Sequence, residues 1–599
     1  MNSFWKTVLA VIVGTICVSL ISGLFTTCVF VGMIASSSQT EKPAQIKEGS
    51  VMLLKINGQV SELAPALPFD FSPLGGFGKI EKSNLRDLQK AIKAAMADDN
   101  ICGIYLNTEN MSAAPATYEA LRHTLAEFRE SGKWIIAYND SYSLGQYYLA
   151  SVADQVICNK IGEVTFDGLT AMNEYPKGLL DKLGIQMQIF RVGSFKSAVE
   201  PYMIEHMSEA NRLQIEVYQR TNWQTWIEDI SASRGLSVET LDSLANEAVS
   251  YMLPDELATT GLVDDMLYKS EVEQLLLEKL GKEKLEDCAV NASQMVANFD
   301  KLFTQDKDDK VGVIYAVGEI ASEAHGSGDG IYYEDLIADI RKVAKDDNCK
   351  AVVLRVNSPG GSAFASEQIW KALTDLKATG KPLVISMGDY AASGGYYISS
   401  PGDYIFAEAN TLTGSIGIFG MIPNFEGLVT GKLGVNIEEV KTHKFGQVSP
   451  FRGVTEQERV KIQRSIEHGY ELFTSRCAEG RGVSQDSIKV IGGGRVWMGR
   501  DALNIGLVDE LGGLDEAIAK AAELAELAED SYSCAVYPLP KTSMETFMAM
   551  FDESKQDLNL RITDAILGST GADRQTIRFI ESLQKADRIQ ARCFDALVY

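Results

Sequence analysis

The sequence lacks the short motifs that mark metal and redox sites. Its 9 cysteines form no Cys-x-x-Cys pair, and its 5 histidines form no His-Glu-x-x-His. We therefore predict no metal site, no cofactor and no disulfide framework. The Gly-x-Ser-x-Gly turn of the α/β-hydrolases is also missing around Ser393, the serine that becomes central below.

Positive charge is scarce as well. Lysine and arginine number 56 against 81 aspartates and glutamates, which gives a net charge of -25 over 599 residues. This excess argues against nucleic acid or an acidic membrane surface as the main partner. With 45% hydrophobic residues, a chain of this length can bury the cores of several domains.

Charge is absent altogether from one segment near the N-terminus, residues 7–34. A run of 28 residues exceeds the roughly 18 that mark a membrane-spanning helix and the roughly 7–15 of a cleavable signal. We expect residues 1–38 to be an uncleaved, single-pass anchor in the lipid bilayer. The alternative is a cleavage site at residues 35–37. Lys6 before the run favours a cytoplasmic N-terminus and an external main body.

The rest of the chain repeats itself. Matched segments lie about 250 residues apart, too far for a solenoid repeat. We expect a first repeat over 39–300, a second over 301–540 and a helical extension over 541–599. The clearest matches are 51–60 with 311–320, 98–106 with 346–354, 132–137 with 380–385, and 260–265 with 505–510.

Each half alternates apolar runs with amphipathic helical stretches. In residues 362–379, for example, Ile369, Leu373 and Leu376 fall on one helical face. This alternation predicts βα units, and hence an α/β fold with a mainly parallel sheet.

The second half carries a candidate nucleophile, Ser393. It follows an apolar run at 383–387 and precedes two glycines and a short helical stretch. A second glycine-rich turn, residues 355–362, also links a predicted strand to a helix. Two such turns on adjacent strands could direct backbone N–H groups at one oxyanion. In the first half Leu144 stands opposite Ser393, so that half offers no nucleophile.

A serine nucleophile needs a base, and two residues are candidates. Lys196 lies in the first half, beside the apolar Phe195, Ala198 and Val199. It could serve as a base if burial kept its amine neutral. His443 is the histidine nearest the motifs of the second half, but it is flanked by lysine and polar residues.

Four motifs together carry a family resemblance: GSFKSAVEPY, RVNSPGGS, YAASGGYY and TLTGSIGIFG. They occur in the order of the bacterial signal peptide peptidase A (protease IV) family, which the chain resembles in its long, duplicated form over residues 45–535. The resemblance implies two tandem ClpP/crotonase-like repeats. It also implies Ser393 as nucleophile, Lys196 as general base and Ser415 as the hydroxyl that orients the lysine. Backbone N–H groups of Gly361 and Gly394 would form the oxyanion hole.

The same resemblance implies a biological role. We expect a membrane-anchored serine endopeptidase with a Ser/Lys dyad that degrades cleaved signal peptides and other peptides. It would be a homotetramer in the bacterial inner membrane, with its catalytic repeats on the periplasmic or extracytoplasmic side.

Two other classes remain open at this point. A crotonase-like acyl-CoA enzyme shares the oxyanion architecture but needs no serine, and an external location argues against it because coenzyme A is cytosolic. A catalytically inactive scaffold of the same fold is the other alternative, and the presence of both Ser393 and Lys196 argues against it.

Overall fold

A computed structural model describes residues 46–62, 82–303, 307–322, 330–529, 531–537 and 589–592. The expected anchor at 7–34 and most of the expected extension at 541–599 lie outside these residues. No helix in the described segments is both long and apolar enough to cross a membrane.

The first repeat is built on a six-stranded parallel sheet with strand order β10-β1-β4-β6-β7-β9. Helices separate the strands along the chain, as the alternation in the sequence predicts. The strands are β1 (Ser50–Lys55), β4 (Ile101–Asn107), β6 (Trp134–Asn139), β7 (Gln155–Cys158), β9 (Asp265–Met266) and β10 (Ala289–Asn291).

The second repeat has the same strand order, β22-β11-β14-β16-β17-β21, again all parallel. Its strands are β11 (Asp309–Val317), β14 (Cys349–Ser358), β16 (Leu383–Ala392), β17 (Tyr404–Ala407), β21 (Glu510–Leu511) and β22 (Tyr532–Tyr537). Two shorter strands, β18 (Leu412–Gly414) and β20 (Val496–Met498), extend it beyond β16. The predicted α/β class with two tandem repeats is confirmed.

One pair of tyrosines shows how closely the repeats correspond. The Tyr147 hydroxyl donates to the carbonyl of Leu262 at 2.8 Å, and the Tyr396 hydroxyl donates to that of Leu507 at 3.0 Å. Both tyrosines lie in the short helix after the third strand of their sheet, α4 (Leu144–Ala150) and α13 (Gly394–Ser399).

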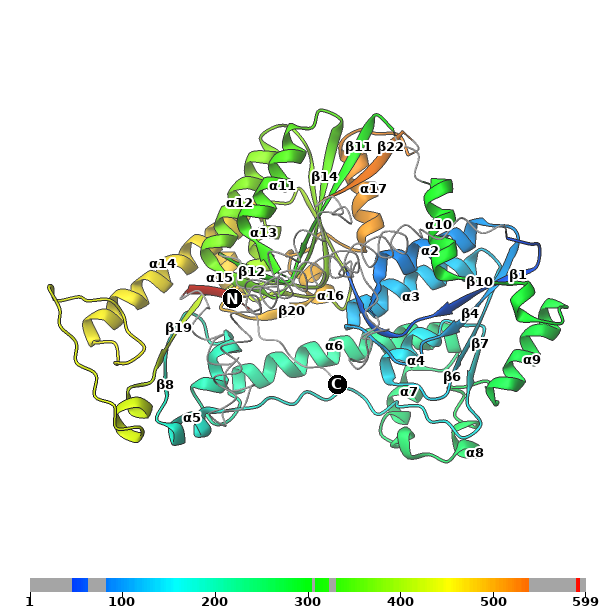
Figure 1. The fold of residues 1–599 in the computed structure, drawn as a ribbon, viewed down its shortest axis with the longest axis horizontal. Helices are drawn as coiled ribbons and strands as arrows, with labels where there is room; N and C mark the ends of the chain where they lie inside the picture. Colours follow the sequence, from blue (N-terminus) through cyan, green and yellow to red (C-terminus); the bar gives the residue numbers. More distant parts are fainter. Residues whose placement is uncertain are drawn as a thin grey trace, which may run out of the picture.

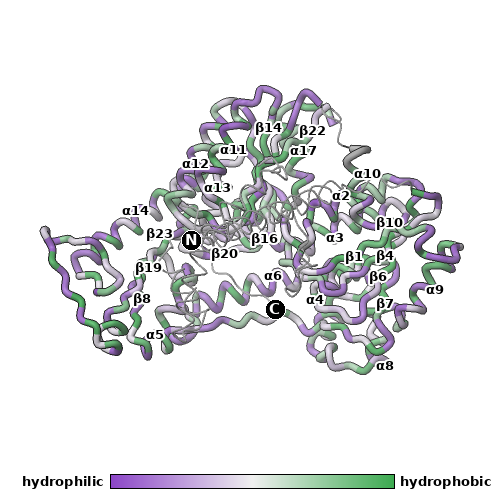
Figure 2. Tube along the Cα trace, viewed as in Figure 1, coloured by the Kyte–Doolittle hydropathy of each residue, from purple (hydrophilic) through white to green (hydrophobic). Residues whose placement is uncertain are grey.

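Helices cover the two sheets, and the hydrophobic colouring concentrates on the strands beneath them (Figure 2). β14 is central in its sheet, and eight of its ten residues are buried. Such a near-continuous apolar strand is typical of a parallel sheet covered on both faces. In the first repeat α2 (Leu85–Ala97) packs against α3 (Pro115–Glu130), and in the second α11 (Tyr333–Lys345) packs against α12 (Ala363–Lys377).

The repeats are joined by more than the covalent chain. The long helix α6 (Glu209–Arg234) runs from the first repeat beneath the second (Figure 1). β8 (Gln186–Arg191) of the first repeat pairs antiparallel with β19 (Phe419–Asn424) of the second, over six residue pairs. This pairing fixes the position of β8 from the first repeat relative to β19 from the second. We call the β8–β19 pairing the joint.

A separate sheet contains this joint, in the order β13-β12-β15-β23-β19-β8. Its other members are β12 (Glu319–Ala321), β13 (Gly330–Tyr332), β15 (Gly360–Ser362) and β23 (Ile589–Arg592). β23, drawn in red in Figure 1, comes from the far C-terminal end of the chain and lies between β15 and β19.

Candidate active site

Ser393 lies at the junction of β16 and α13, and its backbone is strained. Its φ is 57° and its ψ is -111°, a conformation that a residue with a Cβ rarely adopts. The Ser393 N–H donates to the carbonyl of Gly414 at 2.8 Å, which ties the turn to β18. Within the described residues only four non-glycine residues have positive φ, and Ser393 and Ser415 are two of them.

Lys196 reaches Ser393 from the other repeat. It follows β8, and only 1% of its surface is exposed. Its Nζ lies 2.7 Å from Ser393 Oγ, and it lies 3.0 Å from both the hydroxyl and the carbonyl oxygen of Ser415. The lysine thus contacts both Ser393 and Ser415 within one chain, and these are the three residues that the family resemblance implies as nucleophile, base and orienting hydroxyl.

The segment that carries the lysine packs against a run of glycines in the second repeat, residues 492–494. The Phe195 N–H donates to the Gly493 carbonyl at 3.1 Å. Gly494 has φ +86°, and a Cβ there would lie 2.6 Å from the backbone nitrogen of Lys196. Gly193 is similarly confined, because a Cβ on it would lie 2.2 Å from the Gly493 oxygen. Only glycine allows the two backbones to approach this closely.

Gln214 on α6 forms a second link between the lysine segment and the second repeat. Its buried amide Nε2 donates to the Phe195 carbonyl at 3.2 Å and to Ser197 Oγ at 2.8 Å. Its Oε1 accepts from the N–H of Val496, the first residue of β20, at 3.3 Å. One side chain therefore ties both sequence neighbours of Lys196 to a strand of the second repeat.

The glycine turn at 360–361 lies beside Ser393. A Cβ on Gly360 would lie 2.7 Å from the Gly394 backbone nitrogen, so the two turns approach within backbone contact. Gly360 and Gly361 have φ of +102° and +152°. Gly361 pairs with Ile320 of β12 on one side and with Ala591 of β23 on the other.

β23 lies across this turn as an extended peptide. Ala591 is fully buried, and its carbonyl oxygen lies 3.0 Å from where a Cβ on Gly394 would stand. Arg592, the next residue, forms an ion pair with Glu319 at 3.3 Å. The chain's own C-terminal strand thus lies in the groove between β15 and β19, next to the serine.

The structure separates the two candidate bases. His443 lies in an exposed segment, and its imidazole Nδ1 contacts the hydroxyl of the neighbouring Thr442 at 3.0 Å. In the first repeat Leu144, which stands opposite Ser393, is buried at the start of α4.

Sequence reasoning missed Gln214, Gly494 and the strand at 589–592. The triple glycine at 492–494 was a visible signal for a close backbone approach. Nothing in the local sequence distinguishes Gln214 from other glutamines of an amphipathic helix, and nothing marks 589–592 as a partner of β15.

The assembled groups suit nucleophilic catalysis. A buried amine in hydrogen-bonding contact with a hydroxyl is the arrangement in which a base activates a nucleophile. A third group, Ser415, contacts the amine through its hydroxyl and its carbonyl, and the two glycine turns approach each other beside Ser393.

Comparisons with known proteins agree with this chemistry. Peptidase family S49 matches the chain twice, over residues 127–282 and 375–528. Protease 4 of Haemophilus influenzae is 34% identical over 587 residues, covering 93% of this chain and 91% of that protein. Protease 4 of Salmonella typhi is 36% identical over 518 residues, covering 83% and 81%.

Two further similarities are weaker. A chloroplastic serine protease SPPA of Arabidopsis thaliana is 30% identical over 560 residues, covering 92% of this chain and 78% of that protein. A solved structure of a ClpP1 mutant from Listeria monocytogenes matches with a TM-score of 0.24 and 16% identity, over 34% of this chain and 94% of that chain. This last likeness is too slight to add to the argument.

Proposed function

Because the chain belongs to peptidase family S49 and is a serine peptidase, we propose that it cleaves peptide bonds with Ser393 as nucleophile and Lys196 as general base. The observation that carries this assignment is the 2.7 Å contact between Lys196 Nζ and Ser393 Oγ, both buried.

The first step is attack on the scissile carbonyl. Ser393 Oγ forms a bond to the carbonyl carbon while its proton moves to Lys196 Nζ. The carbonyl oxygen becomes an oxyanion. When the tetrahedral intermediate collapses, Lys196 returns the proton to the leaving amine. In the second step Lys196 takes a proton from water, and the water oxygen attacks the acyl carbon. When this intermediate collapses, the bond to Ser393 Oγ breaks, Lys196 returns its proton to that oxygen, and the acid product leaves and ionises.

For this cycle the lysine must begin as a neutral amine. Burial disfavours a charged ammonium group. The single lone pair of the neutral amine must accept the Ser393 proton, so one amine N–H donates to the Ser415 hydroxyl at 3.0 Å. The Ser415 carbonyl, which can only accept, orients the remaining N–H. Ser415 is thus the orienting group of the proposed site.

Backbone N–H groups of Gly361 and Gly394 are the proposed oxyanion donors. Each follows a residue that is held in an unusual backbone conformation, Gly360 at φ +102° and Ser393 at φ 57°. At Ser393, which carries a Cβ, this φ is strained, and such strain persists where the surrounding structure fixes it. Donors fixed in this way need no reorganisation during the reaction.

The groove at β15 and β19 supports peptides as substrates. An extended chain can add a strand there and form main-chain hydrogen bonds on both sides, as β23 does.

The broader assignment follows the resemblance and the relatives' names. The chain would be held in the bacterial inner membrane by residues 7–34, face the periplasm or cell exterior, and act as a homotetramer on signal peptide remnants. The 28-residue uncharged run supports the anchor.

One labelling experiment tests the catalytic assignment. A peptidyl phosphonate should attach covalently to wild-type protein at Ser393, as read by peptide mass mapping, and should leave Ser393→Ala unlabelled. Labelling at another serine, or hydrolysis of casein by Ser393→Ala at the wild-type rate, would contradict it.

A further inference from the structure

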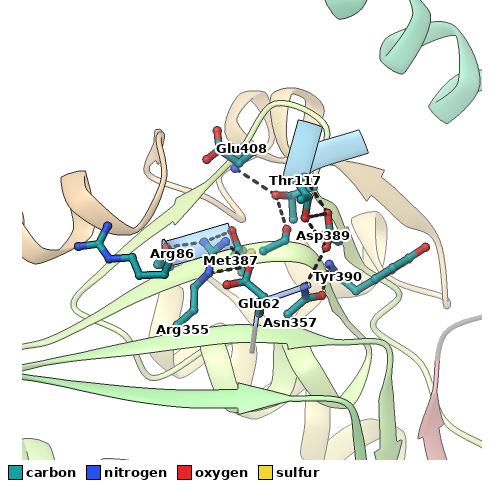
Figure 3. A network of polar contacts seen from close by, with 12 residues as sticks. Glu62, Arg86, Thr117, Arg355, Asn357, Met387, Asp389, Tyr390 and Glu408 are labelled. Carbon is teal, nitrogen blue, oxygen red and sulfur yellow. Dashed lines mark hydrogen bonds and ion pairs between the residues drawn. The ribbon is translucent and has the colours of Figure 1, made fainter. Parts of the chain in front are cut away.

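A buried polar network lies between the two repeats, apart from the serine and lysine. Figure 3 shows its central contacts. Arg355 of β14 donates from Nε to Glu62 of the first repeat at 3.0 Å. Thr117 of α3 donates to Asp389 of β16 through its backbone N–H at 2.8 Å and through its hydroxyl at 2.9 Å. Both pairs join one repeat to the other.

At the edge of this network, three potential metal ligands converge. Glu119 and His123 lie four residues apart on α3 and therefore on one helical face. Glu408 follows β17 in the other repeat. One ligand atom from each side chain lies within 4.8 Å of the other two, and His123 Nδ1 lies 3.7 Å from Glu408 Oε2.

The two carboxylates are more than nine-tenths buried, with exposed fractions of 3% for Glu119 and 2% for Glu408. Glu119 accepts from the backbone N–H groups of Ala409 and Asn410, at 3.0 and 2.8 Å. In Figure 3 the Glu408 carboxylate points away from the pair of Arg355 and Glu62. Among the described residues, His123 is the one basic side chain that forms an ion-pair contact within 4 Å of that carboxylate.

An independent feature is the side chain of Asn410. It is 3% exposed, and neither its Oδ1 nor its Nδ2 makes a hydrogen bond of ordinary geometry. The Asn410 backbone N–H donates to Glu119, so the side-chain amide lies beside that carboxylate. A buried amide that makes no hydrogen bond of ordinary geometry requires an explanation, because such groups are normally satisfied.

Space for a ligand adjoins the cluster. A cavity of about 490 Å³ opens between α3 and the start of α17 (Leu514–Leu524), and all three side chains line it. His123 lies at its rim, with 54% of its side chain exposed, so its imidazole can turn without disturbing the core.

We propose that Glu119, His123 and Glu408 bind a divalent transition-metal cation, of the Zn²⁺ or Mn²⁺ kind, that crosslinks the two repeats. Imidazole favours zinc and related metals, and carboxylate oxygen suits manganese, so the mixed set selects ions that accept both. Ligands about 2.0–2.2 Å from a zinc ion lie roughly 3–4 Å apart. His123 Nδ1 and Glu408 Oε2, 3.7 Å apart, already lie in that range, and Glu119 lies within 4.8 Å of both side chains.

The placement of the two carboxylates supports a cation at this position. Glu119 and Glu408 lie side by side, and both are almost fully buried. A bound cation would offset the repulsion between them. With three protein ligands, coordination positions remain open toward the cavity for water.

No sequence motif predicts this site. Its ligands come from α3 and from a turn almost 300 residues later, and only the packing of one repeat against the other brings them together. A separate repeat would not contain it.

The test uses the full-length chain, purified in detergent and dialysed against EDTA. Calorimetric titration with ZnCl₂ and with MnCl₂ should show one site per chain and a rise in the melting temperature. His123→Ala should weaken binding at least tenfold and Glu408→Gln at least 100-fold. The matched control is Glu127→Gln, one turn further along α3 and lining the same cavity, which should bind as wild type does.

Two results would overturn the proposal. One is no stoichiometric binding of either ion to wild-type protein, which would show that the two carboxylates share a proton instead. The other is binding of unchanged affinity in both His123→Ala and Glu408→Gln, which would place the ion elsewhere. If Glu408→Gln does not fold, the affinity of His123→Ala tests the proposal by itself. That variant should fold, because the half-exposed His123 side chain contributes little to the core.

Discussion

Lys196 Nζ lies 2.7 Å from Ser393 Oγ although 197 residues separate the two along the chain. The lysine belongs to the first repeat and the serine to the second. Each repeat therefore supplies a group that the other lacks, and neither should hydrolyse peptides when expressed alone.

The lysine should not tolerate replacement by arginine. Lys196→Arg and Lys196→Ala should each lower kcat/KM by about 10²- to 10⁴-fold, because a guanidinium stays protonated and cannot accept the serine's proton. In the wild type, activity should rise with pH as the amine loses its proton, so the acid limb of the pH–rate profile belongs to Lys196. Lys182→Arg, at an exposed site, serves as control. A Lys196→Arg enzyme with near-normal kcat/KM would show that another residue is the general base, and His443 would be the next candidate.

Ser393→Ala should abolish peptide hydrolysis, by roughly 10⁴- to 10⁶-fold, while the protein stays folded. The reason is that the acyl-enzyme cannot form without the hydroxyl. Turnover of a fluorogenic peptide measures the loss of activity, and circular dichroism shows whether the variant is folded. Substantial turnover by the folded variant would refute the prediction.

Gly494→Ala should damage activity more than stability. An added methyl group would overlap the backbone of Lys196, so the lysine must shift from Ser393. Gly482→Ala is the matched control, because it has a similar φ of +64° but no atom within 4 Å of the added methyl. Both variants should lose about 1–2 kcal/mol of unfolding free energy from the positive φ, whereas only Gly494→Ala should lose activity. Equal activity losses in the two would count against close packing at the lysine.

Stability should fall in acid through an ion pair between the repeats. Burial alone would raise the pKa of Asp515, but Arg86 and Lys93 outweigh it and lower that pKa to about 2. Since the folded-state pKa lies below the ordinary value of 3.8, the stabilisation is present above about pH 4 and is lost as the pH falls toward 2. The side chain is partly exposed, so we expect about 1–2 kcal/mol.

Chemical denaturation of wild type and Asp515→Asn at pH 7 and pH 3 measures this contribution. The difference in unfolding free energy between the two proteins should be smaller at pH 3. A difference that is the same at both pH values would show that the ion pair does not stabilise the folded state.

Removal of the C-terminal strand should open the groove. A chain that ends at residue 588 should hydrolyse short peptides with a lower KM than a chain that ends at 592, which keeps β23. If the strand is docked in about nine molecules of ten, the KM should fall about tenfold. Equal KM values for the two chains would show that β23 does not compete with peptides.

Much of this architecture could be predicted from the sequence. The apolar runs identified the strands, and the duplication implied that Leu144 and Ser393 occupy matching positions. The lysine could be matched to the serine only through the family motifs, because no local pattern joins β8 to β19.

Other features depended on packing across the repeats. Gln214 acts through three contacts that exist only once α6 lies beneath the second repeat, and Glu119 meets Glu408 only there. Secondary-structure propensity and hydrophobic periodicity describe one element at a time, so they do not predict contacts between distant elements.

The antiparallel insertion of β23 has a kinetic consequence. The strand is tethered to the same molecule whose groove it fills, so its effective concentration does not change when the enzyme is diluted. A free peptide must therefore compete against a fixed local concentration, and weakly bound peptides would be excluded at any enzyme level. Selectivity for tight-binding extended chains would then be set by the enzyme's own C-terminus as much as by the walls of its groove.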